Sequence, residues 1–117
     1  MRNILEDLKM ILSPIDVPVE TGAFASKAPD QYIVIVPMID NFDLYGDDKP
    51  LVDVQEARIS IFAKTSYQRL KNQIVRAVVA AGLTVTQRQF IEYETDTCYY
   101  HYNVDVSHYY NLKITEE

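Results

Sequence analysis

The spacing of apolar residues predicts a helix over residues 3–12. Ile4, Leu8 and Ile11 recur at a helical period, while the charged side chains lie mostly off that stripe. Pro14 ends this helix, because proline keeps the residue before it out of the right-handed helical region. So short a helix is marginal in isolation, and we expect it to dock on the rest of the domain.

A second and longer helix is predicted over residues 65–81. Thr65 and Gln68 have the spacing of a capping box, in which two side chains satisfy free backbone N–H groups at the helix start. Gly82 stands where a left-handed residue often ends a helix. The apolar stripe of this helix comprises Tyr67, Leu70, Ile74, Ala77, Val78 and Ala81.

Alternating and continuous apolar runs predict five strands, over residues 17–21, 31–38, 52–63, 83–94 and 98–108. The order of elements is therefore α-β-β-β-α-β-β. Helices that interrupt runs of strands are typical of the α+β class, and we expect one antiparallel sheet with both helices packed on one face. A chain of 117 residues, 48% of them apolar, suits a single domain over residues 1–117.

Residues 39–50 show no clear period. The segment contains several aspartates, a glycine and a proline, and we expect a long connection or an excursion of a hairpin. Phe42, Leu44 and Tyr45 are apolar residues within this polar stretch. A long loop with apolar content is often functional or held by a partner.

The net charge of −6 is unevenly distributed. Residues 1–50 have 4 basic and 9 acidic residues, residues 51–82 have 5 and 2, and residues 83–117 have 2 and 6. An acidic total argues against a general nucleic-acid binder. No apolar run approaches the ~18 residues that a membrane-spanning helix needs, so we expect no membrane partner.

The residues give little support for catalysis. Three well-separated glycines leave no glycine-rich phosphate loop. Cys98, His101 and His108 suggest a thiol nucleophile or a metal site, but on one extended strand His101 points away from the other two. Cys98 and His108 would also stand about 33 Å apart along that strand. A small hydrolase or thiol enzyme is the weakest functional class, and no cofactor is expected.

Three groups of polar side chains admit more than one interpretation. The aspartates at positions 40, 43, 47 and 48 are a solvated loop, meet a basic neighbour or bind a divalent cation, although their spacing is not that of an EF-hand. Five tyrosines between Tyr99 and Tyr110 pack within the sheet, form a protein interface or stack on nucleic-acid bases, although the net negative charge of residues 83–117 lacks the basic surround that stacking needs. The basic residues of the central segment are either solvated charges or a docking surface for an acidic patch. These residues are Arg58, Arg69, Lys71 and Arg76.

Four stretches of the chain carry a resemblance to a known family. They are QYIVIVPMIDNFDLYGDDKP, VDVQEARISIFAK, the helix YQRLKNQIVRAVVAAG, and TVTQRQFIEYETDTCYYHYNVDVSHYY. From Ile33 to Tyr109 the chain resembles the tail-completion proteins (tail-terminator or head–tail joining proteins) of tailed bacteriophages and prophages of the siphophage type. The likeness lies in residue character and element order, and no matching residue is a catalytic fingerprint.

The resemblance implies a structural role in virion assembly. Such proteins are α+β subunits that form a ring, often a hexamer, which stops growth of the tail tube and joins the tail to the head. The implied partners are copies of the same chain, tail-tube proteins and head-completion or connector proteins, with DNA passing through the pore without specific binding. The implied location is the virion tail or neck, and the host cytoplasm during assembly. This role needs no catalytic residue, cofactor or metal.

Head-to-tail contacts in a ring require two different, complementary surfaces. We expect the acidic segment and the basic strand and helix to be these surfaces, with apolar side chains as anchors. The residues of this hypothesis are Phe42, Leu44, Tyr45, Asp47, Asp48, Arg58, Arg69 and Arg76. The alternative is a small intracellular α+β binding or regulatory domain that presents a tyrosine-rich sheet face to a protein partner.

Overall fold

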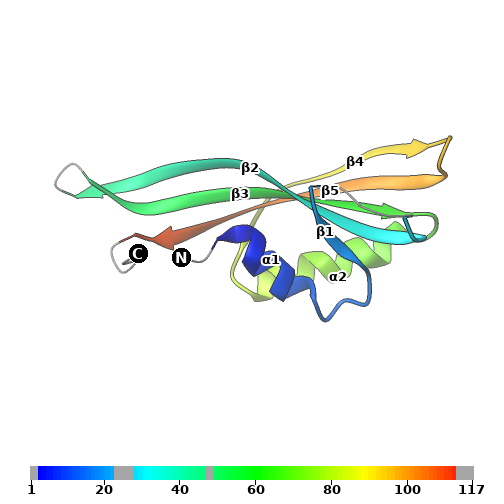
Figure 1. Ribbon diagram of the computed structural model, residues 1–117, viewed down its shortest axis with the longest axis horizontal. Helices are drawn as coiled ribbons and strands as arrows, with labels where there is room; N and C mark the ends of the chain where they lie inside the picture. Colours follow the sequence, from blue (N-terminus) through cyan, green and yellow to red (C-terminus); the bar gives the residue numbers. More distant parts are fainter. Residues whose placement is uncertain (1–2, 23–27, 47–48, 113–117) are drawn as a thin grey trace.

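A computed structural model describes residues 3–22, 28–46 and 49–112 of the protein (Figure 1). In chain order, the elements are α1 (Ile4–Leu12), β1 (Val19–Thr21), β2 (Gln31–Gly46), β3 (Lys49–Ala63), α2 (Tyr67–Ala80), β4 (Thr84–Glu94) and β5 (Tyr99–Asn111). The predicted element order and the α+β class are therefore confirmed.

The five strands form one sheet in the order β1-β2-β3-β5-β4. The strands β2, β3, β5 and β4 pair antiparallel, but β1 pairs in parallel with β2 and places Val19 beside Ile33. The sequence predicted a wholly antiparallel sheet, and this part of the prediction is wrong, because the parallel pairing of β1 makes the sheet mixed. A three-residue strand has too few positions for any periodicity to indicate its direction.

Strands β2 and β3 form a hairpin that is longer than their apolar runs indicate. Pairing continues until Gly46 lies opposite Lys49, with a bulge after Pro37. Residues 39–46 and 49–50 are thus an excursion of a hairpin, which was one of the two predicted alternatives. This part of the hairpin extends past both helices and lengthens the molecule, which measures 53 × 24 × 24 Å (Figure 1).

Both helices cover the same face of the sheet and enclose the core against it (Figure 1). The alternation predicted for β3 is confirmed, because every second side chain from Ala57 to Ala63 is fully buried. On α2 the buried side chains are Leu70, Ile74 and Val78, all members of the predicted stripe, whereas Ala81 of that stripe follows the helix and is exposed. The core also includes Ile4, Leu8, Leu12, Ile33, Ile35, Leu83, Val104 and Val106.

Two side chains fix the N-terminus of α1. Asn3 is the N-cap residue, and its Oδ1 accepts a 2.9 Å hydrogen bond from the backbone N–H of Glu6. Gln55, within β3, accepts a 2.8 Å hydrogen bond through Oε1 from the backbone N–H of Ile4. The first turn therefore finds part of its hydrogen bonding on the sheet, which fixes the helix against β3.

The two ends of α2 differ in how well the sequence predicts them. The capping box of Thr65 and Gln68 does not form, because the N-cap is Ser66 and Gln68 stands too early in the helix to reach back. The predicted C-terminus is confirmed by Gly82, which has a φ of +92°. The backbone N–H groups of Gly82 and Leu83 both donate to carbonyls in the last turn, which is a Schellman motif.

The turn between β4 and β5 contains a residue with a left-handed backbone. Cys98 has a φ of +64° and is the only non-glycine residue with a positive φ among those described. Its backbone N–H donates a 2.7 Å hydrogen bond to the carbonyl of Glu94 and closes the turn. A residue with a side chain costs about 1–2 kcal/mol in this conformation.

Cys98→Gly should therefore stabilise the fold by about 0.5–1 kcal/mol. Glycine relieves the backbone strain at this position, but it also raises the conformational entropy of the unfolded chain, which offsets part of the gain. Urea unfolding of the two proteins measures the difference. The matched control is Asp96→Gly in the same turn, where φ is not positive and the change should destabilise by about 0.5–1 kcal/mol. Equal losses for both variants would contradict this account of the turn.

Candidate functional site

The far part of the β2–β3 hairpin, residues 38–46 and 49–54, projects from the body of the molecule, and we call it the arm. Neither helix covers it (Figure 1), and its exposed apolar side chains include Met38, Ile39 and Phe42. The side chain of Phe42 is 58% exposed, and Tyr109, paired with Val54 in the sheet, is also exposed. Apolar side chains gathered on one projecting element indicate an interaction surface.

The arm is acidic as well as apolar. Between residues 38 and 54 the sequence has five aspartates and one lysine, and Asp40 is exposed on β2. Of the predicted interface residues, Phe42, Leu44 and Tyr45 lie on β2 in the arm. Asp47 and Asp48 lie outside the described residues.

Helix α2 has the opposite charge. Residues 64–82 include four basic residues and no acidic one. Arg69 and Arg76 are exposed on this helix, whereas the ammonium group of Lys71 lies 5.3 Å from the ring centroid of Tyr102. The predicted basic surface is therefore represented on α2 by Arg69 and Arg76.

Arg58 is separated from the arginines of α2 by the sheet. It lies on the face opposite the helices, where its Nε and Nη2 donate to the two carboxylate oxygens of Asp105 at 2.9 and 3.1 Å. These hydrogen bonds raise the pKa of Arg58. Because the side chain of Asp105 is only 5% exposed, Arg58 compensates a buried charge within its own sheet. The structure does not place it on one surface with Arg69 and Arg76.

Most of the tyrosines on β5 pack within the protein. The rings of Tyr100 and Tyr102 lie against Tyr67 of α2, with centroids 5.6 and 5.5 Å apart. Tyr99 is buried on the other face of the sheet. Packing, one of the three predicted interpretations, accounts for these rings, and Tyr109 is the exposed exception.

The cysteine and the two histidines do not come together. Cys98 is exposed in the turn. A hydrogen bond between its side chain and that of Tyr93 raises the pKa of the Tyr93 hydroxyl. His101 and His108 lie on β5, on opposite faces of the sheet, as the two-residue period predicts. Among the described residues, no group of ligand-type side chains combines Cys98 with either histidine.

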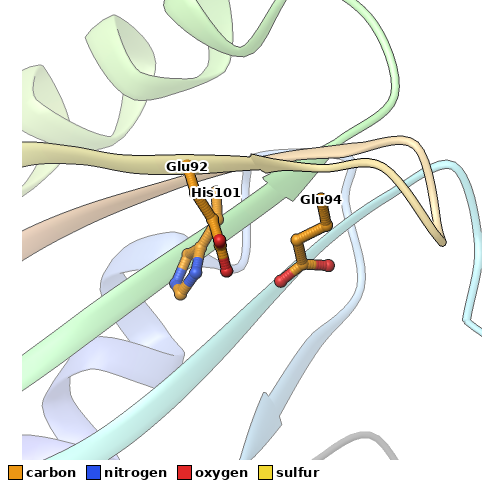
Figure 2. Close-up of side chains that lie close together, drawn as sticks. All are labelled: Glu92, Glu94 and His101. Carbon is orange, nitrogen blue, oxygen red and sulfur yellow. The ribbon is translucent and has the colours of Figure 1, made fainter.

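A group of ligand-type side chains lies where the sequence reasoning placed none. Glu92 and Glu94 of β4 and His101 of β5 each offer one ligand atom, and these atoms lie within 4.8 Å of one another (Figure 2). A bulge between Phe90 and Glu92 creates the group, because it moves Glu92 to the face that His101 occupies. Simple alternation puts Phe90 and Glu92 on one face and hides the arrangement. The sequence contains one indication of this group: two glutamates two positions apart, separated by a short turn from a histidine.

The fold and these surfaces define an α+β protein with a five-stranded mixed sheet and a projecting arm. No protein-family model matches the chain, and no curated protein sequence matches it. The relation to phage tail-completion proteins therefore stays a prediction. Within the described ranges, no helix has both the length and the apolar character needed to cross a membrane.

Proposed function

We propose that the protein is a structural subunit of a phage or prophage tail, which forms a ring that caps the tail tube and connects it to the head. The arm carries this proposal. A single chain leaves Ile39 and Phe42 of the arm in water, on a hairpin outside the core. A projecting apolar element of this kind suits a subunit whose contacts are made with a neighbour.

In the proposed ring, the arm of one copy lies against α2 of the next. The arm is rich in aspartate, whereas residues 64–82 are exclusively basic in their charged side chains. Opposite charges on two different surfaces of one chain favour head-to-tail contact, and such contacts form a ring when the rotation between copies closes. Arg69 and Arg76 would then pair with aspartates of the neighbouring arm.

A groove between α1 and the residues that follow α2 offers a place for the apolar side chains of the arm. It has a volume of about 790 Å³; its apolar lining is Met10, Ile11, Ala81 and Leu83, and its polar lining is Glu6, Asp7, Lys9 and His108. Met10 is largely exposed in the single chain. Seating Phe42 here would remove apolar surface of both copies from water, with charged residues around the contact.

The proposed role also defines partners and location. The ring contacts tail-tube proteins on one side and head-completion or connector proteins on the other, in the tail or neck of the virion. DNA passes through the pore without specific binding, since an acidic chain repels phosphate groups. The role requires no catalysis and no cofactor.

Charge reversal within the acidic sequence segment 38–54 tests the contact. Asp47→Lys/Asp48→Lys should shift the protein from a closed ring toward monomers, because the segment's net charge changes from −4 (five aspartates, one lysine) to 0 and its attraction to α2 of the neighbour is lost. Light scattering at low and high salt measures the change, and high salt should also weaken the unmodified ring by screening the charges. The matched control is Glu92→Lys/Asp96→Lys, at the β4–β5 end of the molecule away from the arm, which should leave the ring intact (Figure 1).

The outcomes separate the assembly role from the particular contact. A closed ring in light scattering and in negative-stain images supports the assembly role. A chain that stays monomeric both alone and when mixed with tail tubes contradicts it. A ring whose size is unchanged by charge reversal at Asp47 and Asp48 retains the role and overturns the contact between the arm and α2.

A further inference from the structure

We propose that Glu92, Glu94 and His101 form a binding site for a divalent transition-metal ion such as Zn²⁺. The three side chains project from the face of the sheet opposite the helices, near the β4–β5 turn (Figure 2). One imidazole nitrogen and two carboxylate oxygens are ligands that zinc accepts in proteins. The site is independent of the arm and of ring formation.

The imidazole of His101 keeps one ring nitrogen available for coordination. Its Nε2 lies 3.0 Å from Oδ1 of Asn103, and a carbonyl oxygen only accepts, so Nε2 carries the proton and Nδ1 keeps a lone pair. Asn103 is only 7% exposed, and its Oδ1 also accepts a 3.0 Å hydrogen bond from Ser60 Oγ. The ring of Phe62 stacks on the imidazole, with centroids 4.3 Å apart. Metal-binding histidines are typically held by such a hydrogen bond from the other ring nitrogen.

The two carboxylates combine one held ligand with one adaptable ligand. Thr97 Oγ1 donates a 2.8 Å hydrogen bond to Oε1 of Glu94, which leaves Oε2 for coordination. Glu92 is exposed, so its side chain has room to rotate. Ligand atoms bound to one zinc ion lie roughly 3.4 Å apart in a tetrahedron. The ligand atoms of Glu92, Glu94 and His101 lie within 4.8 Å of one another, so the separations between them must shorten by about 1 Å for coordination. Rotation of Glu92 about its side-chain bonds supplies that movement.

The mixed ligand set determines the class of metal. Imidazole favours zinc, cobalt and nickel, whereas magnesium and calcium prefer sites made only of oxygen atoms. A cation would also offset the repulsion between two neighbouring carboxylates. Since β4 is an edge strand, a metal bound by both strands would fasten it to β5.

Titration calorimetry of the untagged full-length chain with ZnCl₂ tests the site. The parent for this experiment is the Cys98→Ser variant, because the exposed thiol of Cys98 would bind Zn²⁺ independently of the proposed site. We expect one Zn²⁺ per chain, with affinity lowered by more than about tenfold in His101→Gln and in Glu94→Gln. The matched control is His108→Gln, which changes the only other histidine and should keep the affinity of the parent.

Absence of saturable Zn²⁺ binding by the parent overturns the proposal, and so does equal affinity in the His101→Gln and His108→Gln variants. Binding of Mg²⁺ as tight as that of Zn²⁺ overturns the assignment to transition metals. Circular dichroism checks that each variant is folded, and Glu94→Gln keeps the test decisive if loss of the His101 ring disturbs its stack on Phe62. Co²⁺ gives a second readout, because its absorption spectrum reports coordination directly.

Discussion

Arg58→Met should destabilise the fold by about 3 kcal/mol, because it leaves the carboxylate of Asp105 buried without its partner. The two hydrogen bonds from the guanidinium group, at 2.9 and 3.1 Å, compensate this charge in the native protein. Removing one member of a buried pair costs about 3–5 kcal/mol. The lower end applies here, since the side chain of Arg58 is 39% exposed and water can approach the carboxylate. Urea unfolding at neutral pH measures the loss.

A double replacement shows whether the loss comes from the unpaired charge. Arg58→Met/Asp105→Leu removes both charges and should recover most of the stability, because an apolar pair of similar size is often as stable as a buried ion pair. Arg88→Met changes an exposed arginine on β4 and should stay within about 0.5 kcal/mol of the parent. A loss at Arg58 no larger than that at Arg88 would show that the pair contributes little.

Ile74→Ala should cost a similar amount, about 3 kcal/mol, for a different reason. Ile74 is fully buried on α2 and packs in the core between that helix and the sheet. The substitution loses the transfer free energy of the removed methyl and methylene groups and leaves a cavity, which together cost about 2–5 kcal/mol. Thermal or urea unfolding measures the change.

The same helix provides the control for this substitution. Val79 is 57% exposed on α2, and Val79→Ala should change stability by less than about 0.5 kcal/mol. Alanine also has the higher helix propensity, so the control carries no helix penalty. If the two substitutions cost the same, α2 would not pack through the stripe that contains Ile74.

Elements with one buried face are the ones that the sequence predicts well. On β3, Ile59 and Ile61 alternate with polar residues because one face meets the helices and the other does not. On α2, the spacing of Leu70, Ile74 and Val78 has the same cause with a helical period. Burial on one side leaves a period in the sequence, and the period identifies the element.

The arm has no such period, because no helix covers it. Its aspartates are poor strand formers, yet β2 continues through Gly46 because its backbone pairs with β3. Propensity is a weak guide where an existing strand supplies the hydrogen-bonding partner. The sequence therefore indicated an excursion of a hairpin as one alternative but did not distinguish it from a long connection.

The group of Glu92, Glu94 and His101 and the pairing of Arg58 with Asp105 escaped prediction for a geometric reason. Glu92 joins His101 only because a bulge changes the face that Glu92 occupies, and a bulge leaves no fixed mark in the sequence. Conversely, Arg58 belongs by sequence to the basic segment, but alternation along β3 places it on the face opposite α2, where it meets Asp105. Which charges meet is decided by long-range strand pairing, which local patterns do not specify.

The position of β5 has a consequence for synthesis of the protein on the ribosome. β5 follows every other strand in the chain, yet it lies between β3 and β4, which are not neighbours in the sheet. While the nascent chain grows, the β2–β3 hairpin has an open edge, and β4 has no strand beside which to pair. The sheet closes only after residues 99–111 emerge, so unpaired strand edges persist while residues 64–98 are being made. Chaperones that recognise such edges would therefore act before β5 is made.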